Sequence, residues 1–592
     1  MLRRFVVYFH DCKRDLIGGF VCVIFETVFE LVIPAIMASL IDVGVVRRDM
    51  GDIIRKSLLM VACALVSLFL GALYARLAAR AGQGFGAALR EAEYRNVQGF
   101  SFANMDHFNT SSLITRLTND ITVLQNTISN GFRPFVRAPV MLVMALGMSI
   151  VMSPRLAVVF LVAIPTLAAC LYLILRRLGP MYGIMQRALD RLNLIVQENL
   201  AAIRTVKSYG KEASECRKFD GVNGSFRDAS QRAFHYATMN MPCFQLIMYA
   251  TIVCILWFGG NFIRAGTMQI GELTGFLSYV LQILNSLMML SNVFLMLSRS
   301  VTSASRIAEV LDEKPDIADG DGGWKVERGE IDFDHVSFKY RQSAREPVLS
   351  DICLHISAGQ TVGIIGGTGS AKSSLVQLIP RLYDVSSGSL KIDGHDVREY
   401  PVAPLRDAVG MVLQKNTLFS GTIRENLRWG DPNATDEELD RACHIACVDE
   451  FLPRMPRGYD TDLEEGGVNL SGGQKQRLCI ARALLKRPRV LILDDSTSAV
   501  DTATEAKICR RLARELRDTT KIIITQRIGE VRDADLIVVM QDGRIGDAGT
   551  HEELLGRSQV YRDIYEFQQK GADERKCQDS LCTKNRKTCT AR

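Results

Sequence analysis

The amino-acid sequence predicts two unlike domains: an α-helical membrane domain of six spans with long cytoplasmic extensions and, after it, an α/β domain. Two observations carry this prediction. Up to about residue 300 the chain contains apolar runs that approach the roughly 20 residues a helix needs to cross a bilayer. Beyond about residue 330, short β-rich segments alternate with helical ones, as in a largely parallel sheet covered by helices. A wholly soluble protein is therefore excluded.

Composition narrows the remaining classes. The chain has 592 residues, of which 48% are hydrophobic and 23% charged, and its formal net charge is +6. That charge is too small for a strongly basic nucleic-acid binder, so no nucleic-acid partner is expected. The 15 cysteines are scattered, as in a reducing compartment, and no pair in the body of the chain has zinc-ligand spacing. Cys577, Cys582 and Cys589 have no neighbouring His, so no metal is expected on them.

Six apolar segments form the predicted spans. They are expected at about residues 16–43, 53–79, 135–152, 156–175, 244–263 and 273–297. The segments after the second and fourth spans are long and rich in Arg, whereas the other turns are short. Because long basic loops stay inside, both termini and the α/β domain are expected in the cytoplasm. Leu189–Lys207 keeps helical apolar spacing, so the helices should continue beyond the bilayer.

Several polar residues fall within these spans. Glu26 and Glu30 lie four residues apart on one helix face. An unpaired carboxylate in a bilayer costs several kcal/mol, so this pair indicates a functional site, a buried partnership between helices, or a water-facing level of the span. Gln282, Asn285 and Asn292 in the sixth span either line a polar pathway or form hydrogen bonds between helices.

Changes in composition set the predicted domain boundaries. The parts are a membrane domain over residues 1–310, a linker rich in Asp and Gly over 311–330, the α/β domain over 331–570 and a polar tail over 571–592.

A glycine-rich turn gives the main chemical signal. The buried strand Thr361–Gly366 runs through the segment GGTGSAKS into an apolar helix, Ser373–Leu382. The segment fits the phosphate-binding loop pattern G-x-x-x-x-G-K-[ST], except that Ala371 stands where Gly is expected. In such a loop the backbone N–H groups point at phosphate oxygens. Lys372 would neutralise phosphate charge, and the Ser373 hydroxyl would hold Mg²⁺.

Two further buried strands belong to the same domain, Val490–Leu493 and Ile522–Thr525. The first of them ends in Asp494, within the segment RVLILD. A carboxylate at a strand end, about 120 residues after a phosphate loop, is typical of a group that binds Mg²⁺ or its water shell.

A third motif, Leu470–Gln474, reads LSGGQ and precedes the helical segment Lys475–Leu484. Ser and two Gly ahead of a helix could form a second anion site. With this motif between the phosphate loop and Asp494, the sequence resembles the ATP-binding cassette (ABC) transporters. It is most similar to exporter-type half-transporters, in which a membrane domain is fused before one α/β P-loop ATPase domain, or cassette. The resemblance covers about residues 1–570.

The resemblance implies ATP and Mg²⁺ as cofactors. The residues expected to bind ATP are Tyr340, which would stack on adenine, and Gly366, Gly367, Thr368, Gly369, Ser370, Ala371, Lys372, Ser373, Ser374 and Gln414. The residues expected to hold Mg²⁺ are Ser373, Gln414 and Asp494. The signature residues, which would act on ATP held by a partner chain, are Leu470, Ser471, Gly472, Gly473 and Gln474. Ser498 and Asp501 match the D-loop.

Three segments resemble the parts that join cassette and membrane domain. Glu464–Asn469 resembles the exporter loop that contacts the coupling helices, which are short cytoplasmic helices docked on the cassettes. Phe108–Asp120 and Glu198–Glu212 resemble the stretches at the first and second coupling helices.

Three positions depart from the family pattern. Besides Ala371, Asp495 stands where the family has a catalytic Glu, and Gln526 stands where it has the switch His. The Glu polarises the attacking water. Asp is one methylene shorter, and a displacement of about 1 Å can cost about 10²-fold in rate. Gln does not titrate near neutrality as His does.

These departures predict a heterodimer. Family cassettes pair head to tail, so each ATP lies between one chain's phosphate loop and the other chain's LSGGQ. This chain is expected to bind MgATP at a degenerate site and to complete a hydrolytic site on a second half-transporter. The pair would export a small molecule, lipid or peptide across a cytoplasmic membrane, in keeping with a bacterial source. The alternatives are a fully active homodimeric exporter, an importer built on the exporter fold, and an ATP-gated regulatory or channel-like subunit.

Overall fold

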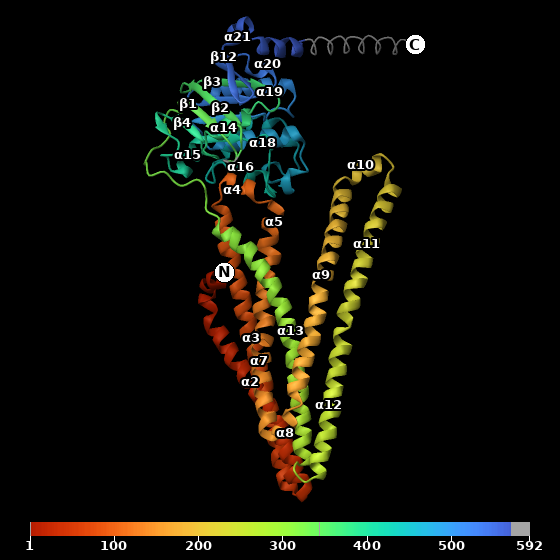
Figure 1. Cartoon of the computed structure of the whole chain (residues 1–592). Coiled ribbons are helices and arrows are strands. Elements are labelled where there is room, and N and C mark those ends of the chain that lie inside the picture. The colour runs from red at the N-terminus through yellow and green to blue at the C-terminus, as the bar shows by residue number, and fades with distance from the viewer. Residues whose placement is uncertain (1, 342–343, 570–592) are drawn as a thin grey trace. The chain divides into compact units, whose positions relative to one another are not determined.

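The computed structural model describes residues 2–341 and 344–569 of the chain (Figure 1). Its internal contacts divide the chain into two compact units, Met1–Gln98 with Asn109–Glu313, and Gly99–Phe108 with Lys314–Arg592. The first is a helical unit and the second an α/β unit. The tail predicted at residues 571–592, with its three cysteines, lies outside the described residues.

Long helices build the helical unit, as Figure 1 shows. Its elements are α1 (Leu2–Phe5), η1 (Val6–Cys12), α2 (Lys13–Ser39), η2 (Leu40–Val45), α3 (Met50–Gln98), α5 (Thr110–Thr115), η3 (Arg116–Asp120), α6 (Ile121–Asn126), η4 (Thr127–Gly131), α7 (Phe132–Met152), α8 (Pro154–Ala157), α9 (Phe160–Ala201), α10 (Ile203–Ser208), α11 (Glu212–Thr238), α12 (Asn240–Arg264) and α13 (Ile270–Asp312). The helical backbone is continuous from α5 through η3, α6 and η4 to the end of α7.

Among the described residues, six helical stretches are long and apolar enough to cross a membrane. They are Lys13–Val45, Met50–Gln98, Thr110–Met152, Pro154–Ala201, Glu212–Arg264 and Ile270–Leu290. Each overlaps one predicted span. The second to fifth stretches contain 49, 43, 48 and 53 residues, about twice what a bilayer requires. The predicted long extensions beyond the spans are therefore present.

Helix α13 is anchored inside the helical unit. Tyr279 is fully buried, and its hydroxyl donates a hydrogen bond of 2.8 Å to the Leu31 carbonyl on α2. The first turn of α13 is held by Asp42, whose carboxylate accepts from the N–H groups of Gly271 (2.6 Å) and Glu272 (3.0 Å). A carboxylate at a helix N-terminus satisfies free N–H groups and interacts favourably with the helix dipole.

The carboxylates within the first span are paired. Glu26 is 4% exposed and forms an ion pair with Arg133 on α7, with Arg137 3.8 Å away. Arg137 also pairs with Glu30. The structure therefore favours the interpretation that these residues are partners between helices.

The amides of the sixth span are arranged differently. Asn285 and Asn292 are exposed. The buried Oε1 atom of Gln282 has no hydrogen-bond partner among the described residues.

The α/β unit contains the remaining elements. They are α4 (Phe102–His107), β1 (Ile331–Phe338), β2 (Leu349–Ile356), β3 (Thr361–Gly366), α14 (Lys372–Gln377), β4 (Ser387–Ile392), β5 (His395–Asp396), α15 (Val402–Ala408), β6 (Val409–Val412), β7 (Gly421–Thr422), α16 (Ile423–Leu427), α17 (Asp436–Ile445), η5 (Val448–Glu450), η6 (Leu452–Arg454), η7 (Gly458–Asp460), β8 (Asp462–Leu463), η8 (Glu465–Gly467), α18 (Gly472–Leu485), β9 (Val490–Asp494), α19 (Thr502–Glu515), β10 (Thr520–Ile524), α20 (Ile528–Val531), β11 (Leu536–Gln541), β12 (Arg544–Gly549) and α21 (His551–Arg557). Residues 559–569 form a further helix.

The main sheet has the strand order β12-β11-β3-β10-β9-β6. All neighbours in it are parallel except β11 and β12. The predicted parallel sheet is confirmed, but a separate antiparallel sheet, β2-β1-β4-β5, was not predicted. Parallel strands bring their carboxyl ends to one edge, where ligands of such sheets bind. The segments after β3, β9 and β10 therefore meet.

Two local features differ from the prediction. The helix after the phosphate loop, α14, ends at Gln377, although the pattern predicted a helix to Leu382. Arg381 has a left-handed backbone (φ 51°), which an α-helix does not accommodate.

The linker begins after Asp312, and its later part is fixed by Asp393, whose carboxylate accepts from the backbone N–H groups of residues 327, 328 and 330.

Candidate nucleotide-binding site

The glycine-rich loop joins β3 to α14 at the centre of the main sheet. Gly366 leaves no room for a side chain, because a Cβ atom there would lie 2.3 Å from the Met540 carbonyl oxygen. Gly369 and Ala371 both have left-handed backbones, with φ of 86° and 68°. That conformation costs a residue with a Cβ atom about 1–2 kcal/mol. The structure thus gives a physical reason why glycine is expected at position 371.

Lys372, the first residue of α14, folds back over the loop. Its ammonium donates to the carbonyls of Gly366 (2.9 Å) and Gly367 (2.8 Å) and to the Ser370 hydroxyl (3.2 Å). Burial lowers the pKa of this ammonium, and the nearby carboxylates of Asp494 and Asp495 oppose that shift. The group can exchange these neutral acceptors for phosphate oxygens, which bind a cation more strongly.

Ser373 and Asp494 meet although 121 residues separate them in the chain. The Ser373 hydroxyl donates a hydrogen bond of 2.9 Å to Asp494 Oδ1 at the end of β9, and Asp494 is only 2% exposed. Burial raises the pKa of Asp494, while the Ser373 bond and Lys372 lower it. A hydroxyl beside a carboxylate suits Mg²⁺, which prefers oxygen ligands.

The position of the expected catalytic carboxylate lies next to these groups. Asp495 is half-buried and has a left-handed backbone (φ 47°). Burial raises the pKa of Asp495, whereas the positive charge of Arg527 and a hydrogen bond from the Gln414 side chain lower it. The structure therefore brings Gln414 to the same place as Lys372 and Asp494, as the sequence predicted.

Gln526 follows β10 and is held from outside the motif. Gln568, on the helix of residues 559–569, donates to the Gln526 carbonyl (2.6 Å), and its own carbonyl accepts from the Ile528 N–H (3.0 Å). Both bonds use the backbone, so they fix the loop whatever side chain residue 526 carries. No motif in the sequence identified Gln568.

Tyr340 stands beside the loop. Its hydroxyl hydrogen-bonds to the Ser374 hydroxyl on the first turn of α14 (2.8 Å), and its ring is 42% exposed. The ring meets Phe338 and Tyr383 edge-on, with centroids 4.9 and 5.1 Å away. An exposed aromatic ring at this place can stack on a planar base.

The signature motif forms a regular helix N-terminus. Ser471 caps α18: its hydroxyl accepts from the Gln474 N–H (3.4 Å), and its own N–H donates to the Gln474 side chain (2.8 Å). A Cβ atom on Gly473 would lie 2.9 Å from the Ala499 carbonyl, so only glycine fits. The exposed Gly472 and Ser471 can present N–H groups to an anion.

One residue outside the motif joins the signature helix to the D-loop. The side chain of Gln476 on α18 donates to the Ser498 hydroxyl (3.3 Å) and accepts from the Ala499 N–H (2.9 Å). Ser498 in turn donates to the Asp495 carbonyl (3.0 Å), and Asp501 caps α19 by accepting from the Thr504 N–H (3.0 Å). The pattern in the sequence did not identify Gln476.

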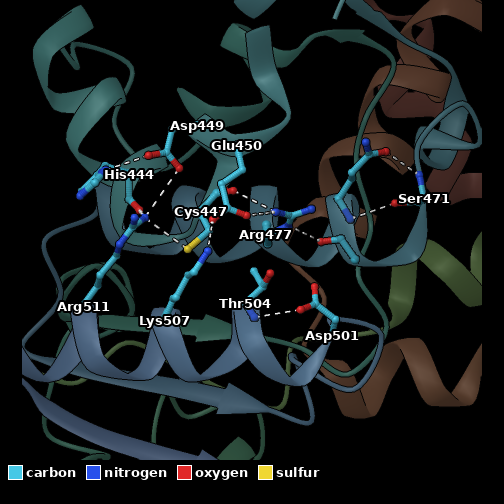
Figure 2. A network of polar contacts seen from close by, with 12 residues as sticks. His444, Cys447, Asp449, Glu450, Ser471, Arg477, Asp501, Thr504, Lys507 and Arg511 are labelled. Atoms are coloured by element: carbon cyan, nitrogen blue, oxygen red, sulfur yellow. Dashed lines mark hydrogen bonds and ion pairs between the residues drawn. The ribbon is translucent and has the colours of Figure 1, made fainter. Parts of the chain in front are cut away.

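A charged network extends this junction (Figure 2). Glu450 lies between Lys507 on α19 (2.9 Å) and Arg477 on α18 (3.5 Å). Arg477 also donates to the Cys447 carbonyl (3.0 Å), and Arg511 on α19 donates to the Cys447 sulfur (3.2 Å). The helix that begins with the signature motif and the helix that follows the D-loop are thus tied together at several points.

The two stretches expected at coupling helices differ in structure. Helix α4 (Phe102–His107) ends before the predicted stretch Phe108–Asp120, which instead begins the third membrane-crossing stretch. Asp106 on α4 accepts from the Tyr383 hydroxyl (2.8 Å), and Phe102 meets the Tyr383 ring edge-on at 5.9 Å. Helix α4 was not predicted, and the coupling role of Phe108–Asp120 stays a prediction.

The second stretch contains α10, a six-residue helix that follows α9 after a break at Ala202 (φ −98°, ψ 15°). The helical spacing of Leu189–Lys207 did not indicate this break. Its neighbours Leu200 and Tyr209 are 66% and 74% exposed. Glu464–Asn469, in contrast, contains the short turn η8, in which Gly466 and Gly467 have φ of 67° and 61°.

Comparison with known proteins gives matches to both units. Residues 16–287 match the ABC transporter transmembrane region, and residues 349–498 match the ABC transporter family of ATP-binding domains. The ABC transporter ATP-binding protein YfiB of Bacillus subtilis is 38% identical over 545 residues, covering 92% of this chain and 94% of its own length. An ABC transporter ATP-binding protein of Mycobacterium tuberculosis is 36% identical over 552 residues, covering 91% and 93%.

Two further comparisons concern exporters. A Staphylococcus aureus protein whose name refers to multidrug export as an ATP-binding/permease protein is 33% identical over 485 residues, covering 81% of this chain and 83% of its own. The solved structure of a bacterial Atm1-family ABC exporter with ATP bound superposes with a TM-score of 0.79 at 24% identity, covering 94% of this chain and 98% of that one. At 24% identity, the similarity to this solved structure shows the fold alone.

Proposed function

Because the chain belongs to the ABC transporters, which couple ATP hydrolysis to transport across a membrane, we propose that it is one half of a heterodimeric exporter. It binds MgATP at a degenerate site of its own and donates its signature motif to a hydrolytic site on the partner. The observation that carries this proposal is the contrast between the two halves of the cassette. Ser471 caps an unaltered signature helix, whereas Asp495 and Gln526 occupy the hydrolytic positions.

The residues around the phosphate loop fit MgATP. Lys372 and the loop N–H groups would hold the phosphates, and Ser373, Asp494 and Gln414 would supply oxygen ligands to Mg²⁺. The bound ion would neutralise phosphate charge and orient the terminal phosphate. Tyr340 takes the base. This set remains complete, so nucleotide affinity is retained even where turnover is poor.

Hydrolysis at this chain's own site is weakened by Asp495. Its shorter side chain holds the carboxylate about 1 Å further from the water that must attack, and such a displacement costs about 10²-fold. Burial raises the pKa of Asp495, and Arg527 and the Gln414 side chain only oppose that shift, so the proposed loss lies in the reach of the carboxylate and not in its basicity. Gln526 has no titratable side chain, so the loop held by Gln568 supplies no imidazole to the terminal phosphate.

A second chain is required to complete either site. The signature helix of this chain projects its N–H groups away from its own phosphate loop in the family arrangement, so they serve the partner's ATP. The exposed apolar residues beside α10, Leu200 and Tyr209, support a further contact in which this coupling helix docks on the partner's cassette.

Movement of the cassette would reach the membrane domain through Tyr383. This residue contacts Asp106 on the short helix α4 and also the ring of Tyr340. Substrate would be a small molecule, lipid or peptide, in line with the multidrug export named for the Staphylococcus aureus relative. The bacterial relatives support a cytoplasmic membrane, with both termini and the cassette in the cytoplasm.

The isolated chain tests the degenerate site. Purified without a partner, it should bind a fluorescent ATP analogue but hydrolyse ATP far more slowly than the roughly 1–10 s⁻¹ of a good enzyme. The double variant Asp495→Glu, Gln526→His should restore turnover only in part, because Ala371 remains. Full turnover of the unaltered chain without a partner would refute the proposal in favour of a homodimer.

Transport assays on the complex in vesicles test the direction in which substrate crosses the membrane. ATP-dependent accumulation in inside-out vesicles, and not in right-side-out ones, supports export. Accumulation in right-side-out vesicles loaded with ATP would identify an importer on the exporter fold. An ATP-dependent ion current without stoichiometric substrate movement would identify the channel-like subunit.

A further inference from the structure

A cluster of metal-ligand side chains lies on the antiparallel sheet, outside the nucleotide-binding site. His335 comes from β1, and Asp351 and Cys353 come from β2. One ligand atom of each lies within 4.8 Å of the other two. His335 Nδ1 is 2.6 Å from Asp351 Oδ1 and 3.5 Å from Cys353 Sγ. All three side chains are exposed, so an ion from solution can reach them.

The backbone of the two strands aims these side chains at one another. The pairing of β1 with β2 shifts register between Phe333 and Val336, which places His335 in a β-bulge. His335 and Asp351 both have left-handed backbones, with φ of 49° and 54°. A bulge changes the direction in which a side chain points. A left-handed backbone costs a non-glycine residue about 1–2 kcal/mol. The paired strands hold both residues in place, so the ligand set needs little ordering on binding.

We infer that His335, Asp351 and Cys353 form a binding site for a divalent ion of the zinc class. Zinc is bound by imidazole nitrogen at about 2.0–2.1 Å, thiolate sulfur at about 2.3 Å and carboxylate oxygen at about 2.0–2.2 Å, in tetrahedral geometry. Those bond lengths set nitrogen and sulfur ligands about 3.5 Å apart, and the His335–Cys353 distance is 3.5 Å.

The third ligand requires only a small movement. The same bond lengths set nitrogen and oxygen about 3.3 Å apart, so the Asp351 carboxylate must move outward from its present 2.6 Å. Both side chains are more than two-thirds exposed, at 72% and 71%, and can rotate. The fourth position is left to water. The thiolate and imidazole favour Zn²⁺ over Mg²⁺ and Ca²⁺, which prefer oxygen.

An adjacent triad, with one residue on each strand and one just before β1, provides a matched control. Glu330, Asp332 and His355 also lie close enough to hold an ion. Both ring nitrogens of His355 already have neighbours, Asp332 Oδ1 at 2.5 Å and the Ser357 hydroxyl at 3.3 Å. This triad has no sulfur, so an ion bound there lacks the optical signature of a thiolate ligand.

The test is a titration of the purified full chain with Co²⁺, a spectroscopic substitute for Zn²⁺, after chelator treatment under a non-thiol reductant. One equivalent should produce a sulfur-to-cobalt charge-transfer band, and Zn²⁺ should abolish it. Cys353→Ser should remove the band, and His335→Ala should weaken Co²⁺ binding by about 10-fold or more. His355→Ala, the matched control, should leave band and affinity unchanged.

The proposed site would be refuted if the unaltered chain showed no charge-transfer band or if the band persisted in Cys353→Ser. A band lost only in the triple variant Cys577→Ser, Cys582→Ser, Cys589→Ser would also refute it, because the ion would then be bound by the tail. X-ray absorption of the Zn²⁺-loaded chain provides an independent check, with one sulfur expected at about 2.3 Å. Unchanged ATP-analogue binding shows that each variant is folded.

Discussion

At the scale of single residues, Ala371 shows how one methyl group conflicts with the backbone that its motif requires. The loop needs a left-handed residue before Lys372, and alanine takes that conformation (φ 68°) at a cost that glycine does not have. The strain lies in the loop itself, directly beside the groups that hold phosphate.

Ala371→Gly is expected to stabilise the cassette by about 0.5–1 kcal/mol, because the left-handed penalty exceeds the freedom that glycine adds to the unfolded chain. Thermal unfolding with and without MgATP measures this and any gain in nucleotide affinity. The control is Ala506→Gly on the exposed face of α19, which should lower stability by about 1 kcal/mol. If both variants change the free energy of unfolding in the same direction, the left-handed backbone at residue 371 is not a source of strain.

Glu530 gives a second prediction at this scale. Burial and the neighbouring carboxylate of Glu505 raise the pKa of Glu530 to about 8, and both residues line a cavity of about 880 Å³. Because the folded chain binds this proton more tightly than the unfolded chain does, its stabilising contribution is complete below about pH 4.5 and is lost as the pH rises through about 8.

Glu530→Gln should therefore unfold at a higher temperature than the unaltered chain at about pH 8.5 and at a similar temperature at about pH 5. The amide can still donate a hydrogen bond to Glu505. Thermal unfolding across this range measures the effect, and Glu566→Gln on the exposed face of the last described helix is the control. If the unfolding temperatures of Glu530→Gln and the unaltered chain depend on pH in the same way, the carboxyl pair of Glu530 and Glu505 is not the cause of that dependence.

At the scale of elements, Glu450 connects the helix of the signature motif to the helix of the D-loop. It lies between Arg477 and Lys507 (Figure 2). Both pairs are partly exposed, so their contribution to overall stability is small. Their effect should appear instead in how well the two helices keep their mutual position.

Glu450→Gln is expected to lower the maximal ATPase rate of the complex about two- to five-fold with little change in KM. Lys507→Met removes only one of the two pairs of Glu450 and should lower the rate less, and the double variant should fall little below Glu450→Gln, since the Lys507 pair is already lost in that variant. Glu515→Gln is the control, because its pair with Arg441 (3.3 Å) joins α19 to α17 far from the D-loop. Fully additive losses would show that Glu450 and Lys507 act separately.

Periodicity and short motifs predicted those elements whose signal is local. The strand, loop and helix around Lys372 are contiguous in sequence, and the buried strand that ends at Asp494 is a continuous apolar run. Helix α4 was not predicted, because its Phe102 and Asp106 contact Tyr383, about 280 residues away, and no local pattern encodes those contacts. Cysteine spacing missed the His335 cluster because its ligands come from two strands, joined only by their pairing and a bulge.

At the scale of the whole molecule, the two motifs of one cassette serve different ATP molecules in the proposed heterodimer. Lys372 serves this chain's own slow site, and Gly472 serves the partner's hydrolytic site. Losing groups that stabilise transition-state charge typically costs about 10²–10³ in rate. Weaker binding of a nucleotide that rarely turns over should cost less.

Gly472→Asp and Ser471→Arg should therefore nearly abolish ATPase activity and transport by the complex, because each places charge or bulk where the terminal phosphate docks. Lys372→Ala should leave a larger residual activity. Phosphate release and vesicle transport, at matched expression, compare the three complexes. If Lys372→Ala is the most damaging change, this chain's own site drives the cycle and the assignment of the two sites is reversed.

The hydrogen bonds of Gln476 have a thermodynamic consequence. They join α18, whose N-terminus would face the partner's ATP in the proposed heterodimer, to Ala499, four residues beyond this chain's Asp495. If ATP at one site changes the affinity of the other by some factor, reciprocity requires the same factor in return. A site that seldom hydrolyses its nucleotide can thus still act as an effector, and the cellular ATP concentration, sensed there through occupancy alone, would set the affinity of the site that does the chemistry.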